Sequence, residues 1–265
     1  MSLKNKYGST ALVAGASEGI GAAFASSLAA QGLDLILIAR RAEPLKKLAD
    51  ILSDRHKVST RCIVCDLSDE ASAEKVTESL DGQEVDFMVY NAALSHIGSF
   101  LGHPSQGHDQ AARLNMITPM RLVHHYGGKM VEKGRGAIIL MSSMTGFQGS
   151  GYLATYAATK AFSMVLAESL WYEWKDKGVD IMACCAGATA TPGYINSKPG
   201  KASLFAPAIL KPEEVVSECF SRLGRVPSFI TGRGNRFASF IMQSLLSRRS
   251  AVKIMGDNTR KMYGI

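Results

Sequence analysis

Residues 10–30 read TALVAGASEGIGAAFASSLAA and predict a strand, a tight turn and a helix in direct succession. Thr10–Ala14 is short and apolar, the next seven residues contain three glycines, and small residues suited to close helix packing follow. Glycines in such a turn let backbone N–H groups approach a diphosphate at the helix N-terminus. The spacing is G-x-x-x-G-x-G, so the turn by itself also fits a strand–helix connection that binds nothing.

The same alternation of short apolar runs and helical patterns continues along the chain, which is typical of a parallel sheet covered on both faces. We find no internal repeat and no low-complexity linker, so we expect one domain over residues 1–265. The predicted strands span residues 10–14, 35–39, 58–65, 85–90, 137–142, 180–185 and 228–231. The predicted helices span residues 20–31, 43–54, 70–80, 110–132, 153–177 and 212–223.

A second informative stretch is Tyr156-Ala-Ala-Thr-Lys160, which follows Ser143 by thirteen residues. A free phenol has a pKa of about 10 and is a poor acid or base at neutral pH. Lys160 lies one helical turn from Tyr156, so we expect its charge to lower the phenol pKa into a useful range. Ser143 ends an apolar strand and is expected to bring a hydroxyl to the same place; Ser142 is the alternative. Tyr156 could otherwise be an ordinary half-buried helix aromatic.

Together, the glycine turn and the Tyr–Lys pair resemble the short-chain dehydrogenase/reductase family. Its further motifs recur in order from about residue 10 to residue 191: Asp66-Leu67, Asn91-Ala92-Ala93, Asn115, Ser143, and Gly187 to Thr191. Ala14, Ala93 and Ala186 replace the family's usual threonine, glycine and proline. The resemblance implies an α/β, Rossmann-type doubly wound three-layer fold. Its seven-stranded parallel sheet has the order 3-2-1-4-5-6-7, and ligands lie at the carboxyl ends of the strands.

The resemblance also implies the site residues. The catalytic set is Asn115, Ser143, Tyr156 and Lys160, in which Asn115 would hold a water that connects Lys160 to solvent. Asn115 could instead be a helix amide that is satisfied locally, and Thr189 competes with Thr191 for the nicotinamide. The expected cofactor contacts are Gly15, Ser17, Gly19, Ile20, Gly21, Arg40, Arg41, Asp66, Leu67, Asn91, Ala92, Ala93, Tyr156, Lys160, Gly187, Thr189 and Thr191.

The end of the second predicted strand indicates which nicotinamide cofactor is bound. NAD enzymes usually place a carboxylate there for the ribose 2′-hydroxyl, whereas arginine suits a 2′-phosphate. This chain has Ala39 at that position, followed by Arg40 and Arg41. We therefore expect NADP(H) in preference to NAD(H), with Arg40 on the phosphate and Ser17 as a further donor. Alternatively, both arginines are simply solvated at the start of a helix.

Composition limits the other classes of protein. The chain is 46% hydrophobic, yet no stretch reaches the roughly 18–20 apolar residues of a membrane span. We expect a cytoplasmic protein, since the N-terminus lacks a secretory apolar segment and five cysteines without a framework indicate reduced, mostly buried thiols. No metal site is expected, because Cys62 and Cys65 would face opposite sides of a strand and the six histidines show no ligand spacing.

The net charge of +7 is concentrated near the C-terminus. Residues 222–265 carry +8, which leaves −1 for the rest. Within the basic extension near residues 232–265, Phe237, Phe240, Ile241 and Leu245 have helical spacing, and the predicted helix 236–249 ends in two cations. It could pack over the substrate pocket or a neighbouring subunit, dock to an acidic or phosphorylated carrier protein, or associate with an anionic membrane. Nucleic acid is not expected, because no binding motif accompanies the charge.

The expected function is hydride transfer between NADP(H) and a ketone or alcohol, with Tyr156 as the general acid or base. A hydrophobic substrate is expected from apolar residues in the family's lid region near 192–208 and on the helix after Tyr156. The alternative is a catalytically silent NADP(H) sensor that acts through partners. We expect a homodimer or homotetramer through helices 110–132 and 153–177. The candidate pocket residues are His96, Phe162, Met164, Trp171, Tyr194, Ile195, Leu204, Phe205 and Ile209.

Overall fold

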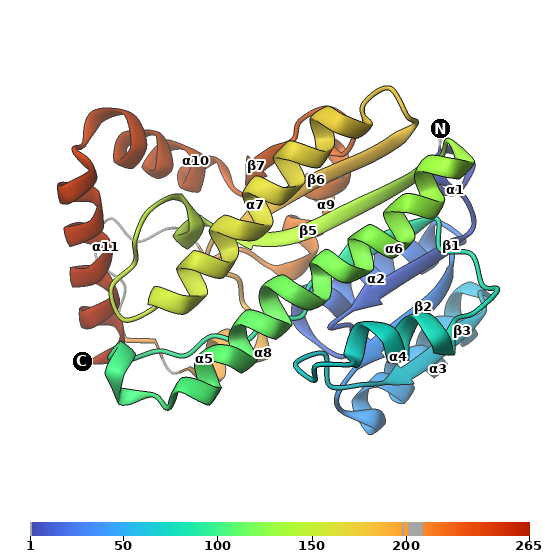
Figure 1. Ribbon diagram of the computed structural model, residues 1–265, viewed down its shortest axis with the longest axis horizontal. Coiled ribbons are helices and arrows are strands. Elements are labelled where there is room, and N and C mark those ends of the chain that lie inside the picture. Colours follow the sequence, from blue (N-terminus) through green and yellow to red (C-terminus); the bar gives the residue numbers. More distant parts are fainter. Residues whose placement is uncertain (1, 198, 201–208) are drawn as a thin grey trace.

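The computed structural model describes residues 2–197, 199–200 and 209–265, and it contains one seven-stranded sheet (Figure 1). All strand pairs are parallel, and the order is β3-β2-β1-β4-β5-β6-β7, as predicted. The strands are β1 (Thr10–Ala14), β2 (Asp34–Ala39), β3 (Thr60–Val64), β4 (Phe87–Tyr90), β5 (Gly136–Ser143), β6 (Val179–Ala186) and β7 (Ser228–Ile230).

Helices cover both faces of this sheet. On one face lie α2 (Gly19–Ala30), α3 (Ala42–His56) and α9 (Pro212–Arg222); on the other lie α4 (Ser72–Ser79), α6 (Thr118–Lys133) and α7 (Ala154–Trp174). The other described helical segments are α1 (Leu3–Tyr7), η1 (Phe100–Gly102), α5 (Ser105–Ala112), η2 (Arg113–Ile117), η3 (Met144–Phe147), α8 (Pro192–Asn196), α10 (Arg233–Phe240), η4 (Ile241–Leu245) and α11 (Arg248–Tyr263).

Alternation along the strands explains the two cores. Successive strand side chains point to opposite faces, so Ala11 and Val13 of β1 pack with α2, α3 and α9. Leu12 and Ala14 pack instead with α4, α6 and α7. All four side chains are fully buried, which is why the strands read as continuous apolar runs.

The predicted helix 110–132 differs most from the structure. It begins earlier, at Ser105, and consists of α5, the π-helical turn η2 and then α6. A π turn holds one more residue than an α turn, and apolar periodicity in the sequence does not reveal it. Such turns are frequent at functional sites, and this one contains Asn115. The other predicted strands and helices are present, with ends that differ by at most three residues.

The predicted tail helix 236–249 is two helices rather than one. α10 continues into the π turn η4 and stops at Leu246, whose backbone is extended (φ −105°, ψ 146°). Ser247 then caps α11 by accepting a hydrogen bond from Ser250 N at 3.2 Å. Arg248 and Arg249 therefore open α11 instead of closing the preceding helix, because a serine N-cap starts a new helix just before them.

The lid region near residues 192–208 was expected to be irregular, but its first residues form α8. Residues 198 and 201–208 lie outside the described residues, so the prediction for Leu204 and Phe205 falls there. Among the cysteines, Cys184, Cys185 and Cys219 are buried as expected, whereas Cys62 is exposed on β3, an edge strand. Within the described part of the chain, no helix is both long and apolar enough to cross a membrane, and no cluster of His, Cys, Asp or Glu could hold a metal ion.

The buried sheet gives a test with a matched leucine control. Leu12 is fully buried on β1, whereas Leu101 in η1 is 90% exposed. Leu12→Ala should lower the free energy of unfolding by about 2–5 kcal/mol, because lost burial and a residual cavity add. Leu101→Ala should change it by less than about 0.5 kcal/mol. Urea unfolding followed by circular dichroism measures both, and equal losses would contradict the packing described.

Candidate active site

The turn between β1 and α2 is shaped for an anion. Gly15 and Gly19 have positive φ (78° and 58°), and a Cβ on Gly21 would lie 1.9 Å from Gly15 O. The N-cap residue Glu18 makes no side-chain cap, and the first turn of α2 contains no acidic side chain. The first N–H groups of a helix have no intrahelical partner, so this N-terminus can bind phosphate.

The end of β4 lies directly on this turn. Asn91 Nδ2 donates to Gly15 O at 3.1 Å, and the backbone N–H groups of Asn91 and Ala92 donate to Ala14 O. A Cβ on Gly15 would come within 2.6 Å of Ala92 N, so only glycine permits this approach. The predicted contacts Gly15, Asn91 and Ala92 are therefore together, and Ala93 follows as an exposed residue.

Two arginines flank the same end of the sheet. Arg41 Nη2 donates to Glu18 Oε2 at 2.6 Å, and Arg40 Nη1 lies 3.7 Å from Asp66 Oδ2. Burial raises the pKa of Asp66, but hydrogen bonds from Ser68 and the charge of Arg40 outweigh it, so the pKa is lowered overall. Arg40 is mostly exposed, which leaves its guanidinium accessible to a ligand.

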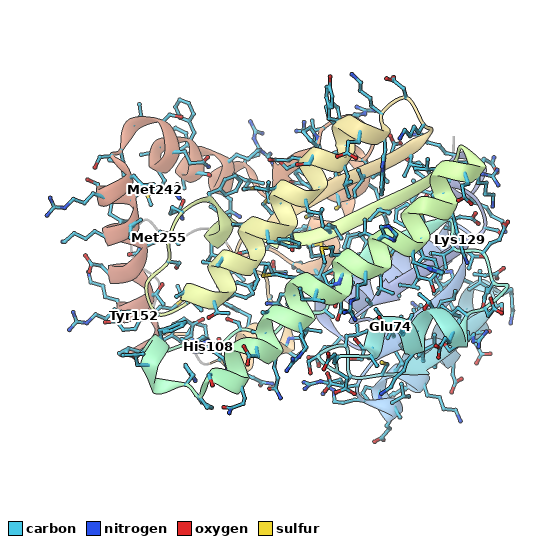
Figure 2. All side chains as sticks on the ribbon, viewed as in Figure 1. Glu74, His108, Lys129, Tyr152, Met242 and Met255 are labelled. Carbon is cyan, nitrogen blue, oxygen red and sulfur yellow. The ribbon has the colours of Figure 1, made fainter. Side chains whose placement is uncertain are left out.

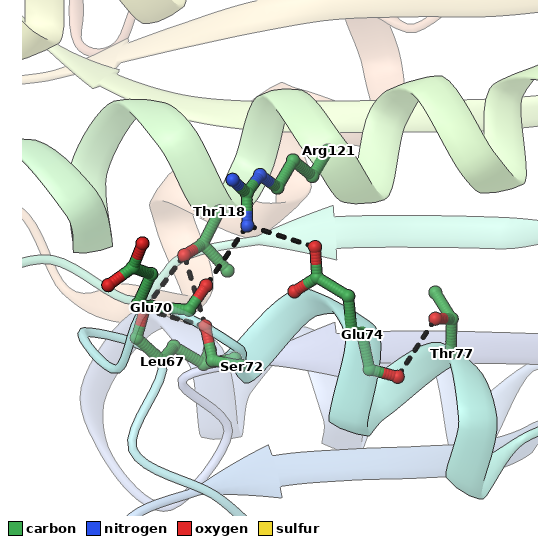
Figure 3. Close-up of polar contacts among 7 residues, drawn as sticks. All are labelled: Leu67, Glu70, Ser72, Glu74, Thr77, Thr118 and Arg121. Carbon is green, nitrogen blue, oxygen red and sulfur yellow. Dashed lines mark hydrogen bonds and ion pairs between the residues drawn. The ribbon is translucent and has the colours of Figure 1, made fainter.

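The segment after Asp66 is fixed by its polar contacts with α4 and α6 (Figure 3). Leu67 O accepts from Thr118 Oγ1 at 2.9 Å and from Ser72 Oγ at 3.2 Å. Arg121 Nη1 donates to Glu74 Oε1 at 2.9 Å and to the carbonyl oxygen of Glu70. These contacts hold Asp66 and Leu67, two of the predicted cofactor contacts, at the carboxyl edge of the sheet.

Ser143 and Tyr156 meet because η3 packs closely on α7. A Cβ on Gly146 would lie 2.8 Å from Ala161 N, so glycine is required at this contact. Ser143 Oγ accepts from Thr145 N and Thr145 Oγ1 at 3.2 and 3.0 Å, and the Ser143 side chain lies near enough to the Tyr156 phenol to lower its pKa. Burial nevertheless raises the pKa of Tyr156 overall, because it outweighs the lowering by Ser143.

Ser142, the alternative to Ser143, makes a different contact. Its buried hydroxyl donates to Lys160 O at 2.7 Å and so joins β5 to the backbone of α7. This hydroxyl is therefore used within the fold, and the one beside Tyr156 belongs to Ser143.

Lys160 is buried against β5. Its Nζ donates to Met141 O at 2.7 Å and lies 5.6 Å from the centre of the Tyr156 ring. Burial lowers the pKa of Lys160 to about 8. We expected Lys160 to lower the pKa of Tyr156, and this is wrong for the side-chain positions observed. The ammonium is bonded to a strand carbonyl, and burial disfavours the charged forms of both groups.

Asn115 is buried, and its side chain is satisfied within the fold. Oδ1 accepts from Leu94 N at 2.9 Å, and Nδ2 donates to Leu94 O at 2.9 Å and to Thr159 Oγ1 at 3.0 Å. This matches the alternative of a locally paired amide. The backbone carbonyl of Asn115 lies in the π turn and accepts a long hydrogen bond, 3.5 Å, from Ser163 Oγ. The water-binding role stays a prediction, for this carbonyl rather than the amide.

The segment after β6 distinguishes Thr189 from Thr191. Thr189 is buried, and its hydroxyl donates to Gly187 O at 3.1 Å. Thr191 caps α8 by accepting from Tyr194 N, and its Cγ2 would lie 2.9 Å from a Cβ on Gly19. Thr191 is therefore the threonine that reaches the phosphate-binding turn.

Several predicted pocket residues have other contacts in the fold. Met164 and Trp171 are partly buried and pack against the core between the sheet and α7, so their place in a substrate pocket stays a prediction. His96 stacks 5.0 Å from His103 in the loop after β4. Sequence reasoning missed Tyr263 at the end of α11, which helps to raise the pKa of Tyr156. No family motif lies near Tyr263, so only its place in a helical tail could have suggested it.

Comparison with known proteins agrees with this geometry. A family model described as short chain dehydrogenase matches residues 9–201. A 7β-hydroxysteroid dehydrogenase of Collinsella aerofaciens is 34% identical over 89% of this chain and 90% of its own, and one of Mediterraneibacter gnavus is 32% identical over 97% and 98%. The chain therefore belongs to the short-chain dehydrogenase/reductase family and is an oxidoreductase that acts on CH–OH or carbonyl groups.

Solved structures extend this likeness. A structure from work on 7β-hydroxysteroid dehydrogenase stereoselectivity superposes with a TM-score of 0.89 at 33% identity, over 96% of this chain and 99% of its own. A short-chain dehydrogenase of Sphingobium yanoikuyae in complex with NADPH has a TM-score of 0.75 at 29% identity, over 84% and 87%. The family binds nicotinamide cofactors, and the uncapped start of α2, the glycine turn and the exposed Arg40 fit such a dinucleotide.

Burial of Lys160 has a consequence for stability against pH. Its pKa falls from 10.5 to about 8 on folding, so between these values the unfolded chain binds more protons and stability rises with pH. In Lys160→Met this contribution is absent. From pH 7 to pH 9.5 the unfolding free energy of the wild type should therefore gain about 2 kcal/mol relative to the variant. Urea titrations at several pH values measure the difference; parallel curves would refute it.

Proposed function

We propose that the protein is an NADP(H)-dependent reductase of bulky apolar ketones, with oxosteroids as the substrate class. The proposal rests above all on one observation, the half-buried Tyr156 side chain, whose phenol pKa is lowered by the neighbouring Ser143 and whose ring centre lies 5.6 Å from Lys160 Nζ. The 7β-hydroxysteroid dehydrogenases that cover almost the whole chain support the substrate class.

The proposed chemistry follows from the three side chains. The nicotinamide, when bound, supplies the hydride. Tyr156 gives its proton to the substrate oxygen, and the Ser143 hydroxyl donates a hydrogen bond to the same atom, where negative charge develops. The raised pKa of Tyr156 keeps the phenol protonated at neutral pH, so Tyr156 is in the form that donates a proton to a carbonyl oxygen. Lys160, whose pKa is about 8, is able to exchange a proton near neutral pH.

Preference for NADP(H) is supported by the two arginines at the end of β2. Arg40 has an exposed guanidinium 3.7 Å from Asp66 Oδ2, and Arg41 is held on Glu18 of the glycine turn. A 2′-phosphate has the charge and geometry that arginine binds through paired hydrogen bonds.

Self-association through α6 and α7 is part of the same proposal. Met120, Val165 and Tyr172 on these helices are 39–67% exposed, and family members are commonly oligomeric. Burying these side chains against a second copy would be favourable. Sedimentation of the purified protein distinguishes a dimer from a tetramer.

Tyr156→Phe tests the general-acid role. The variant should lose about 10²–10⁴-fold in kcat for oxosteroid reduction, because the proton donor is removed. NADPH affinity should stay within about twofold in fluorescence titration. Undiminished turnover would contradict the mechanism, and a wild-type protein that binds NADPH but oxidises it with no ketone or aldehyde would favour the sensor alternative.

Arg40→Ala tests the cofactor preference. Losing a charged hydrogen-bond partner costs about 1.5–3 kcal/mol, so the Kd for NADPH should rise about tenfold or more while that for NADH barely changes. Arg55→Ala, at the far end of α3, removes the same charge away from the turn. Wild-type protein that binds NADH as tightly as NADPH would overturn the preference.

A further inference from the structure

α11 packs along the loop that joins Ser143 to Tyr156 (Figure 1). Arg248 Nη1 donates to Phe147 O at 2.7 Å. A Cβ on Gly149 would lie 3.6 Å from Val252 Cγ2, and one on Gly151 would lie 3.1 Å from Gly256 Cα. The contacts recur every four residues of α11, so one face of the helix follows residues 147–151.

The last turn of α11 reaches the other side of the site. Gly200 N donates to Met262 O at 2.6 Å, and the Tyr263 hydroxyl lies 3.4 Å from Ser197 Oγ. Figure 2 shows Met255 of α11 at the same end of the molecule as Tyr152, which belongs to the loop before α7. α11 therefore spans from the Ser143–Tyr156 connection to the residues that follow α8.

Three tyrosines on three elements belong to this region of the molecule. Tyr156 lies on α7, Tyr194 on α8 and Tyr263 on α11. Burial is the main cause that raises the pKa of Tyr156 and of Tyr194, and the neighbouring Tyr263 raises both further. The contacts agree with this proximity on the side of α8, because Ser197 Oγ lies 3.4 Å from the Tyr263 hydroxyl and donates to Tyr194 O at 2.7 Å. The end of α11 therefore lies against the end of α8, while an earlier part of the same helix follows the loop that leads to Tyr156.

We propose, resting on the proposed function, that the last turn of α11 forms a wall of the substrate site and that Tyr263 determines specificity. Its hydroxyl binds an oxygen substituent of the substrate, away from the reacting carbonyl. A separation of 3.4 Å from Ser197 Oγ is long for an O–H···O hydrogen bond, so the Tyr263 hydroxyl keeps its capacity for a ligand. The preferred substrate is a bulky ketone that carries a second polar group, a hydroxyl or a carboxylate.

Tyr263→Phe removes only this hydroxyl. Its KM should be compared with that of the wild type for 3-hydroxy-7-oxocholanic acid, for the same acid without the hydroxyl, and for its methyl ester. Losing one hydrogen bond should raise KM for the first compound about threefold to tenfold. If Tyr263 binds the 3-hydroxyl, the wild type and Tyr263→Phe should have equal KM for the acid without that hydroxyl. If Tyr263 binds the carboxylate, the two proteins should have equal KM for the methyl ester. kcat and the Kd for NADPH should stay within about twofold.

Tyr126→Phe is the matched control, because the Tyr126 hydroxyl is buried in the core beneath α6 with no hydrogen-bond partner among the described residues, and this variant should behave as wild type with every compound. Equal KM ratios for all three compounds would overturn the proposal. So would a fall in kcat with KM unchanged, since Tyr263 would then act through Tyr156 and not on the substrate.

A glycine pair tests the packing independently. A Cβ on Gly151 meets Gly256 Cα at 3.1 Å, which is tight, whereas a Cβ on Gly256 meets Gly151 Cα at an ordinary 3.8 Å. Gly151→Ala should displace α11 and raise KM severalfold for the hydroxylated compound, and Gly256→Ala should not. Equal KM values for Gly151→Ala and Gly256→Ala would contradict the proposal that α11 forms a wall of the substrate site. If the wild type is active, Tyr156→Phe is inactive and Tyr263→Phe has unchanged kinetics, this inference alone is rejected. If Tyr156→Phe is fully active, the proposed mechanism is rejected.

Discussion

The close approach of η3 to α7 at Gly146 is the constraint on which the site depends. No side chain fits between Gly146 and the backbone of Lys160 and Ala161, so η3, which directly follows strand β5, lies in contact with helix α7 and holds β5 and α7 together. Two hydrogen bonds then join them in opposite directions, from Ser142 Oγ to Lys160 O and from Lys160 Nζ to Met141 O. With both elements fixed, the end of the strand and the start of the helix bring their hydroxyls together.

The parallel sheet places the remaining contacts. Because all seven strands run the same way, the turns after β1, β4 and β5 meet at one edge. The strand order reverses at β1, which lies between β2 and β4. In sheets of this type, ligands bind at such a reversal, beyond the carboxyl ends of the strands. Asn91 Nδ2 donates to Gly15 O, so the end of β4 is joined to the glycine turn after β1.

Much of this was predictable from sequence, because the responsible signals are local. Continuous apolar strands such as 35–39 and 137–142 and the glycine turn indicate the fold class, and the spacing of Ser143, Tyr156 and Lys160 predicts a catalytic set. These features depend on local backbone conformation and on the period of apolar side chains, and both can be inferred from the order of residues along the chain. Family resemblance supplied the strand order, which the structure bears out.

The features that escaped prediction depend on three-dimensional context. The π turn at η2 adds a residue without changing the apolar period, and Leu246 breaks a tail whose spacing is helical on both sides. Burial raises the pKa of Tyr156, and the Lys160 ammonium is hydrogen-bonded to the Met141 carbonyl oxygen. Neither is encoded in the four-residue separation of Tyr156 and Lys160.

The separate capping of α11 has a consequence for how relatives can diverge. The match to the family model ends at residue 201, well before α10 and α11. Ser247 starts α11 afresh after the extended Leu246, so this helix forms its own cap without help from α10. The chain thus joins a shared dinucleotide platform to an autonomous tail segment. Transplanting that segment between relatives is a route by which ligand choice could be altered while the hydride-transfer machinery is inherited unchanged.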